Sequence, residues 1–294
     1  MVTGKINSGL SIHHFFVCLN LAFLIFLPTG IRAANNDTLV FQNALNRLST
    51  AGDSLLRGNT DSVRLVAHAS FQRLLDSILH RPGGASLSFY QIKALSVVQS
   101  RDKRLKTITW LLNTKSDNAW SYYGYMVIRP KSGDSIIIKP LQQRKDISKD
   151  ELEVMKPDDS SWGGCIYYDI IQHTYKKTNS YLLLGWAPQS AQVTRKLAEA
   201  VRLKDNGHLL SQPLIRAGGK TRFRMVFDYN ASASMTLRYD EKKKMVVMDH
   251  LSPSDPRPEA KGMYALYGPD MTYDGLRFAK GYWQLIRDID ARNK

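Results

Sequence analysis

The sequence predicts an α+β protein, in which an N-terminal helical hairpin packs on a predominantly antiparallel β-sheet body, either a sandwich or a curled sheet. Apolar residues recur at helical spacing up to about residue 80, and from about residue 89 the period changes to two. Turn residues then separate roughly 10–12 short segments at hairpin spacing. With 294 residues, 43% of them hydrophobic, the chain can bury a large core.

Residues 1–33 have the order of a secretory signal peptide. Lys5 precedes an apolar run over residues 15–27, and Ala33 offers a small residue for cleavage. The run is shorter than the ~20 residues that a membrane-spanning helix needs. Cys18 lies inside it without small residues before it, which argues against lipid attachment. We therefore expect an exported protein, periplasmic or secreted, with no transmembrane span after cleavage.

Residues 34–84 are expected to form the helical hairpin. Gly58 is placed to end the first helix, Thr60 or Asp61 can cap the second, and the second stops before Pro82. The short link favours an antiparallel pair. The apolar stripes of the two helices contain Leu39, Val40, Phe41, Ala44, Leu45, Leu48, Leu55 and Leu56, then Val63, Val66, Ala67, Phe71, Leu74, Leu75, Ile78 and Leu79.

Residues 85–294 are expected to form the β-rich body, in one domain with the helices. The clearest alternation runs over residues 222–229, where Phe223, Phe227 and Tyr229 face one way while Arg224 and Asp228 face the other. A pleated strand with one buried face produces this pattern. Further strands are expected at residues 104–110, 120–129, 136–138, 166–175, 181–186, 235–239, 245–248, 276–278 and 282–289.

Two segments are expected to depart from the sheet. Residues 190–201 predict a helix, because Val193, Leu197 and Val201 recur at helical spacing. Residues 253–262 contain three prolines and several charges, which predicts a long surface loop.

The charge of the chain indicates attraction to anionic partners but no specific nucleic-acid binding. The net charge is +15, and removing residues 1–33 takes away two basic residues and no acidic one, which leaves +13. Beyond residue 88 the excess is spread nearly evenly along the sequence, whereas a nucleic-acid footprint should cluster. A basic exported protein is attracted to anionic envelope polymers or phospholipid head groups, with an affinity that salt weakens.

Cys165 is the first candidate catalytic residue. It follows Trp162, Gly163 and Gly164, and a thiol that begins a helix after glycines can act as a nucleophile beside a histidine. The residues after it also read as a strand with a hairpin partner at 181–186, which favours a small buried side chain. After signal cleavage Cys165 is the one cysteine left, so the mature chain forms no intramolecular disulfide.

An acidic cluster near the C-terminus supplies the other candidates. Asp249, His250, Asp255, Asp270 and Asp274 could provide a carboxylate pair for acid and base work on a glycoside, or bind Ca²⁺. Several of these aspartates adjoin proline or glycine, as turn residues do. The sequence lacks a calcium-loop pattern, a two-histidine zinc motif, a serine-nucleophile elbow and a phosphate-binding loop, so we expect no metal and no cofactor.

Aromatic residues are numerous and allow a second interpretation of the sheet. They can form a platform that holds sugars or peptides, although in strands such residues more often pack in the core. The group comprises Trp110, Trp120, Tyr122, Tyr123, Tyr125, Trp162, Tyr167, Tyr168, Trp186 and Trp283.

The chain resembles a family of exported bacterial proteins for which no activity is established. The resemblance covers most of the mature chain and implies no catalytic residue. It is carried by residues 181–186, 224–240, 249–256, 267–270, 273–276 and 288–293.

These observations predict an exported envelope or secreted binding protein without recognised catalytic machinery. Its partner is expected to be an envelope protein or an anionic glycan. The alternatives are a hydrolase acting outside the cytoplasm through Cys165 or a C-terminal carboxylate pair, and a structural or assembly partner in export.

Overall fold

The computed structural model describes residues 29–116, 119–133, 135–145, 147–156, 162–210 and 212–290, with side chains from Leu39 onward. The chain divides into two compact units, Met1–Leu39 and Val40–Lys294. Most of the expected signal peptide lies outside the described residues, and the expected cleavage point after Ala33 falls within the first helix. None of the described helices is both long and apolar enough to cross a membrane.

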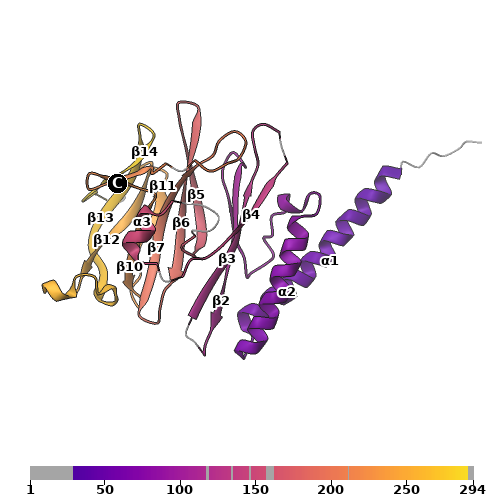
Figure 1. Cartoon of the computed structure of the whole chain (residues 1–294), viewed down its shortest axis with the longest axis horizontal. Helices are drawn as coiled ribbons and strands as arrows, with labels where there is room; N and C mark the ends of the chain where they lie inside the picture. The colour runs from indigo at the N-terminus through magenta and orange to yellow at the C-terminus, as the bar shows by residue number, and fades with distance from the viewer. Residues whose placement is uncertain are drawn as a thin grey trace, which may run out of the picture. The chain divides into compact units, whose positions relative to one another are not determined.

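Two helices precede the sheets, as the sequence predicts. Helix α1 spans Thr29–Arg57 and α2 spans Asp61–Leu79. Thr60 caps α2, because its hydroxyl accepts a hydrogen bond from the backbone NH of Val63 at 3.3 Å. The part of α1 from Val40 onward and α2 run antiparallel, with Leu48, Leu55, Phe71 and Leu75 buried between them and the first sheet (Figure 1). The helical hairpin is therefore confirmed.

The rest of the chain forms three sheets, whose neighbouring strands all run antiparallel apart from β14 and β8. The first sheet has the order β1-β2-β3-β4, from β1 (Ser96–Gln99), β2 (Leu105–Thr114), β3 (Ala119–Ile128) and β4 (Ile137–Leu141). The second has the order β10-β7-β6-β5, from β5 (Ile166–Tyr175), β6 (Thr178–Pro188), β7 (Val193–Arg202) and β10 (Arg224–Asn230). The third has the order β11-β12-β13-β14-β8-β9, from β8 (Ile215–Ala217), β9 (Lys220–Arg222), β11 (Leu237–Asp240), β12 (Met245–Pro253), β13 (Tyr267–Ala279) and β14 (Tyr282–Ile286).

Three hydrophobic clusters hold these layers together. One lies between the helices and the first sheet, the second between the first and second sheets, and the third between the second and third sheets. Within Val40–Lys294 the order is therefore helices, first sheet, second sheet and third sheet, as the ribbon also shows (Figure 1). The predicted α+β class, with a mainly antiparallel body, is confirmed.

Strand β10 differs from the prediction in its burial. Met225, Phe227 and Tyr229 do share one face, but the opposite face, which carries the charges, is buried as well: Arg224 is 1% exposed and Asp228 is 5% exposed. Both residues face β7, where they lie directly opposite Glu199 and Arg195. Charged residues therefore lie between two packed sheets because each has an opposite charge across the strand pair.

The helix predicted over residues 190–201 is wrong, because this segment forms β7. Val193, Leu197 and Val201 satisfy a period of two as well as a helical period, and pairing with both β6 and β10 selects the strand. A short helix, α3 (Lys149–Val154), was not expected, although Ser148 and Glu151 form the capping box that predicts its start. The described residues contain fourteen strands, more than the 10–12 expected. The predicted loop over residues 253–262 contains one of three 3₁₀ turns, at Gly84–Ser86, Pro258–Ala260 and Tyr264–Leu266.

Candidate functional site

A cavity of about 280 Å³, hereafter the edge cavity, lies where the edge of the second sheet meets the third. Side chains from α3, β10, β12, β13 and the chain after β14 converge on it, together with two tyrosines near the start of β13. Its main polar and aromatic residues are Lys149, Glu153, Arg222, Phe227, Asp228, Asp249, His250, Tyr264, Tyr267, Asp274 and Arg287.

The cavity exists because the outer edge of β10 is covered in two places. Glu153 of α3 covers the first, where its carboxylate accepts a hydrogen bond from the NH of Val226 at 3.1 Å and its carbonyl accepts one from Phe223 at 3.0 Å. The side-chain amide of Asn230 covers the second by donating to the carbonyl of Ala265. Along an antiparallel strand, the backbone NH and C=O groups of successive residues point alternately toward and away from the neighbouring strand. Those of Asp228, like those of Val226, point away from β7 and toward the opening of the cavity between the two covered places.

His250 and Arg287 are positioned by one buried carboxylate. Asp274 is 4% exposed, and its Oδ2 lies 2.9 Å from Nδ1 of His250 and also accepts a hydrogen bond from Arg287. Its Oδ1 accepts one from the backbone NH of Asp288 at 3.2 Å. On the other side of the ring, Nε2 of His250 lies 4.0 Å from Oδ2 of Asp270. Both oxygens of Asp274 therefore have partners within the fold, so this carboxylate orients His250 and Arg287 rather than binding a ligand directly.

The other carboxylates of the cavity are also held. Asp228 forms a two-pronged ion pair with Arg195 at 2.7 and 2.8 Å. Asp249 accepts a hydrogen bond from the NH of Thr236 at 2.6 Å. Glu153 pairs with Arg222, and Nζ of Lys149 lies 3.8 Å from it. The lining is therefore a rigid set of alternating charges, in which Arg287 keeps 62% of its side chain exposed.

Neither Asp270 nor Asp255 lines the cavity, although Asp270 lies beside its residue His250. Burial of Asp270 favours the neutral acid, but the hydrogen bonds from the hydroxyl and backbone NH of Thr272 outweigh it and hold the pKa of Asp270 below its ordinary value. Asp255 instead pairs with Arg257. The hydrogen bonds from Arg257 lower the pKa of Asp255, so it remains a loop carboxylate, as the turn interpretation predicts.

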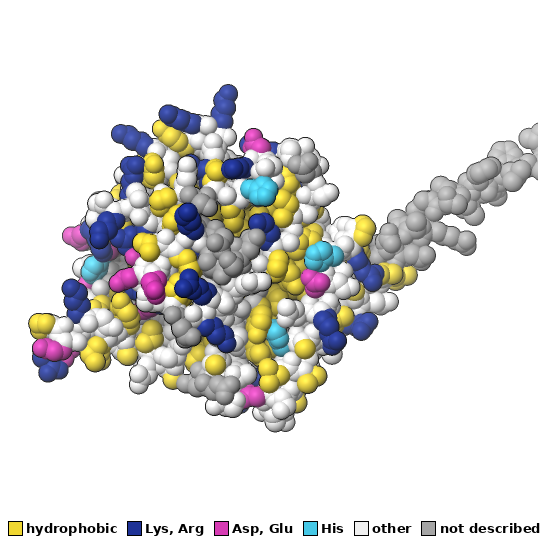
Figure 2. Space-filling model, in the orientation of Figure 1, with side chains coloured by type: hydrophobic (Ala, Val, Ile, Leu, Met, Phe, Trp, Pro, Cys, Tyr) yellow, Lys and Arg dark blue, Asp and Glu magenta, His cyan; other side chains and the backbone are white. Residues whose placement is uncertain are grey.

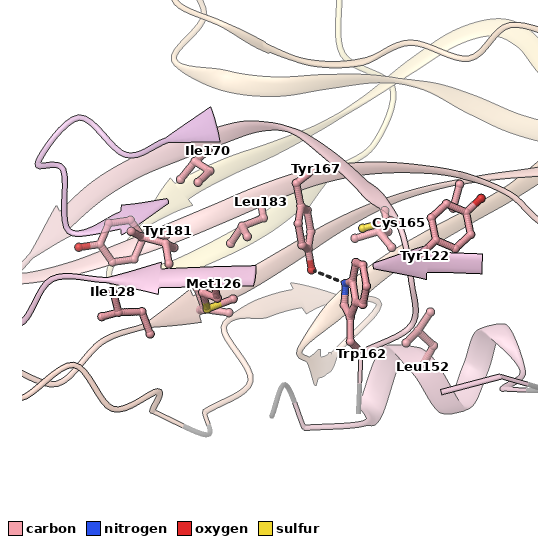
Figure 3. Packing of buried hydrophobic residues seen from close by; sticks show 14 of the residues in the cluster. Tyr122, Met126, Ile128, Leu152, Trp162, Cys165, Tyr167, Ile170, Tyr181 and Leu183 are labelled. Carbon is pink, nitrogen blue, oxygen red and sulfur yellow. Dashed lines mark hydrogen bonds between the residues drawn. The ribbon is translucent and has the colours of Figure 1, made fainter. Parts of the chain in front are cut away.

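Cys165 is buried in the core between the first and second sheets, away from the edge cavity. It directly precedes β5, so the helix-start version of this candidate is wrong. Figure 3 shows its sulfur beside the rings of Trp162 and Tyr167, which are joined by a hydrogen bond of 3.2 Å. The side chain is 0% exposed, and burial raises the pKa of the thiol well above its ordinary value. A protonated, enclosed thiol lacks the reactivity and access that a nucleophile needs.

Most of the aromatic residues pack in the core rather than form a platform. Trp110, Tyr122, Trp162, Tyr167 and Trp283 are each at most 3% exposed. Trp120, Tyr123 and Tyr168 are half-buried, and Trp186, with 37% exposed, lines a separate hollow that also contains Tyr168.

The sequence identified His250, Asp249 and Asp274, which the structure brings to one cavity, but not the residues that complete it. Arg287 lies within the strand predicted at residues 282–289, and Tyr264 and Tyr267 lie beyond the loop predicted at residues 253–262. The two tyrosine rings lie 5.4 Å apart between centroids, at 59°. The capping box of Ser148 and Glu151 was the one local signal that could have indicated α3, and with it Glu153.

The arrangement suits hydrogen bonding to a small polar ligand. Carboxylates accept and guanidinium groups donate, while tyrosine rings give an apolar surface. Among the described residues no group of three or more His, Cys, Asp or Glu side chains is placed to hold a metal ion. No protein-family model, curated protein or solved structure matches the chain.

Proposed function

We propose that the chain is an exported binding protein and that the edge cavity holds one residue of a glycan. The observation that carries this proposal is the convergence of fixed donors and acceptors beside the Tyr264–Tyr267 pair. Every hydroxyl of a sugar both donates and accepts, so it suits a lining in which carboxylates and cations alternate. A volume of about 280 Å³ suits a single ring rather than a large ligand.

The charge of the chain supports a glycan that carries acid groups. The mature net charge is +13, and Figure 2 shows Lys and Arg side chains over much of the visible face. Cations of this kind raise the local concentration of an anionic polymer and speed its encounter with the protein. Arg287, exposed at the cavity and held at one end by Asp274, is placed to receive the acid group.

Titration with neutral and acidic oligosaccharides tests this proposal. Arg287→Gln should weaken binding about tenfold or more, because a charge-assisted hydrogen bond is lost. The matched control is Arg257→Gln, which removes an exposed arginine that also pairs with an aspartate but lies outside the cavity. Equal effects of the two substitutions, or no shift of the His250 ring resonances on titration, would contradict the proposal.

Hydrolysis is a second candidate, favoured by the contacts of His250. A histidine held by Asp274 at Nδ1 can exchange a proton through Nε2, which faces Asp270. The described lining residues of the cavity include no serine, threonine or cysteine, so the histidine would have to activate water. Release of reducing ends from a bound glycan, lost in Asp274→Asn, would support hydrolysis. Binding without turnover would support a binding protein alone.

A further inference from the structure

Five of the eight described non-glycine residues with positive φ are lysines. They are Lys103 (57°), Lys176 (48°), Lys177 (64°), Lys244 (51°) and Lys280 (51°). Glycine and asparagine occupy this left-handed region most easily, whereas a side chain such as that of lysine is strained there. Every one of the five lies in a hairpin turn, between β1 and β2, β5 and β6, β11 and β12, or β13 and β14. Lysine therefore occupies these turns despite the backbone preference.

The four turns meet at one end of the three stacked sheets, hereafter the turn end. Arg101 of the first turn pairs with Glu241 of the third. Asp102 binds the second hairpin, because its backbone NH donates to Gln172 at 2.9 Å and its carboxylate accepts from Asn179 at 2.7 Å.

The fourth turn reaches the second through a close packing contact. A Cβ atom added at Gly281 would lie only 2.9 Å from the ring of Tyr175. The topology therefore gathers lysines that are far apart in the sequence, because the turns that carry them lie together at the upper end of the sheets in Figure 1.

The side chains at the turn end face solvent. All five lysines are exposed, and Tyr175, with 37% exposed, lies beneath the ammonium group of Lys176 at 5.5 Å. Three acids lie in or beside these turns, and each is engaged within the fold: Asp102 accepts hydrogen bonds from Asn179 and Tyr181, Glu241 pairs with Arg101 of the first turn, and Asp240 accepts a hydrogen bond from the backbone NH of Lys243. Basic residues that are spread evenly along the sequence are thus partly concentrated at the turn end of the folded chain.

We propose that the turn end docks on the surface of an anionic phospholipid bilayer. Protruding turns present their cations to a broad surface, whereas a glycan chain is held by pockets and grooves. Each lysine close to anionic head groups strengthens binding about fivefold, and the contributions multiply. Tyr175 adds an aromatic ring with a polar tip, the kind of side chain that accumulates at membrane interfaces. This proposal does not depend on the edge cavity or on its ligand.

Vesicle co-sedimentation of the chain beginning at residue 34 tests the proposal. Binding is expected to vesicles of phosphatidylglycerol and phosphatidylcholine, to fall steeply with added salt, and to be absent from phosphatidylcholine alone. Replacing the five lysines together by glutamine should weaken binding at least a hundredfold. The matched control replaces Lys93, Lys115, Lys145, Lys220 and Lys261, which are exposed and lie outside the four turns, with the same change of net charge.

A glycine version of the same five sites separates binding from folding. Glycine suits the left-handed backbone, so this variant should melt no lower than the wild type and still bind vesicles as weakly as the glutamine variant. Equal losses in the test and control sets, or wild-type binding to a soluble anionic polysaccharide but not to vesicles, would overturn the proposal.

Discussion

Four hydrogen bonds converge on the carboxylate of Asp102. The donors are the hydroxyls of Ser100 and Tyr181 at 2.6 and 2.7 Å, the amide of Asn179 at 2.7 Å and the backbone NH of Arg104 at 3.1 Å. Burial favours the neutral acid, but these bonds outweigh it and hold the pKa of Asp102 below its ordinary value of 3.8. The ionised carboxylate therefore stabilises the junction of the β1–β2 and β5–β6 hairpins.

The pH dependence of stability should reveal this contribution. A lowered folded-state pKa means that the stabilisation is fully present above the unfolded value of about 4 and is lost as pH falls through the folded value. Asp102→Asn should reduce the free energy of unfolding by about 1–3 kcal/mol at pH 7. The difference from the wild type should shrink below about pH 4, as measured by urea unfolding at several pH values. A difference that stays constant down to pH 2 would contradict this account.

At the residue scale, the sequence predicted which side chains are candidates for a site better than it predicted their burial and their partners. His250, Asp249 and Asp274 were recognised as candidates, but whether a lone aspartate lies in a turn or in a buried strand depends on residues far away. Asp274 adjoins Gly275 and looked like a turn residue, yet it is buried in β13 by its contacts with His250 and Arg287. Local composition does not record such partners.

At the element scale, β7 and β10 are joined by two buried ion pairs on one face. Glu199 lies opposite Arg224 and Arg195 opposite Asp228, with Leu197 and Val226 between them. Nε of Arg224 lies 2.8 Å from Glu199. Slipping β10 by one residue would move Arg224 and Asp228 to the opposite face, away from Glu199 and Arg195, so these pairs fix the alignment.

Breaking the Arg224–Glu199 ion pair should lower the stability of the fold. Arg224→Met leaves Glu199 buried without a countercharge and should lower the free energy of unfolding by about 3–5 kcal/mol. Adding Glu199→Leu removes that charge, so the double variant should be more stable than the sum of the single effects predicts, by about 1–3 kcal/mol. Chemical denaturation of the wild type, both single variants and the double variant measures this coupling. Strictly additive effects would show that the two side chains do not stabilise each other.

Elements whose apolar residues recur with one clear period could be predicted. Elements whose apolar spacing fits both a helix and a strand could not. Helix α2 was recognised from Thr60 and its apolar stripe, and the hairpins from their turn residues. β7 was mistaken for a helix because sheets cover both of its faces, so its apolar residues no longer alternate cleanly. The burial of Arg224 was missed for the same reason, since arginine normally marks a solvent-facing position.

At the scale of the whole molecule, stability depends on the helical hairpin as well as on the sheets. Leu48 and Leu55 of α1 are at most 4% exposed, and Phe41 packs against the same cluster. Burying a side chain of this size stabilises by roughly 1.5–3 kcal/mol. The two buried leucines and the half-buried Phe41 together therefore supply a large part of the total stability of an ordinary domain, about 5–15 kcal/mol.

Shortened chains should separate the role of α1 from that of the segment before it. A chain that begins at Val40 keeps the compact unit and should unfold in one cooperative transition. A chain that begins at Asn59 loses the buried side chains of α1 and should be largely unfolded at 37 °C. Circular dichroism during thermal melting distinguishes the two. A cooperative transition in the shorter chain would show that the sheets are stable alone.

The stacking of three sheets was beyond sequence-based prediction. Each hairpin is encoded locally, but the strand order β10-β7-β6-β5 depends on β10 joining β7 across more than twenty residues. The edge cavity and the turn end both arise from such long-range assembly. Their residues were visible in the sequence, whereas their proximity was not.

The cover that α3 places over β10 also bears on self-association. An uncovered edge strand is a template on which a second copy can add its own strand, and repeated addition leads to aggregates. Glu153 occupies two backbone donors of that edge, at Phe223 and Val226. Detaching the single six-residue helix Lys149–Val154 would therefore expose a strand edge to which a second copy can add, without any unfolding of the hydrophobic core.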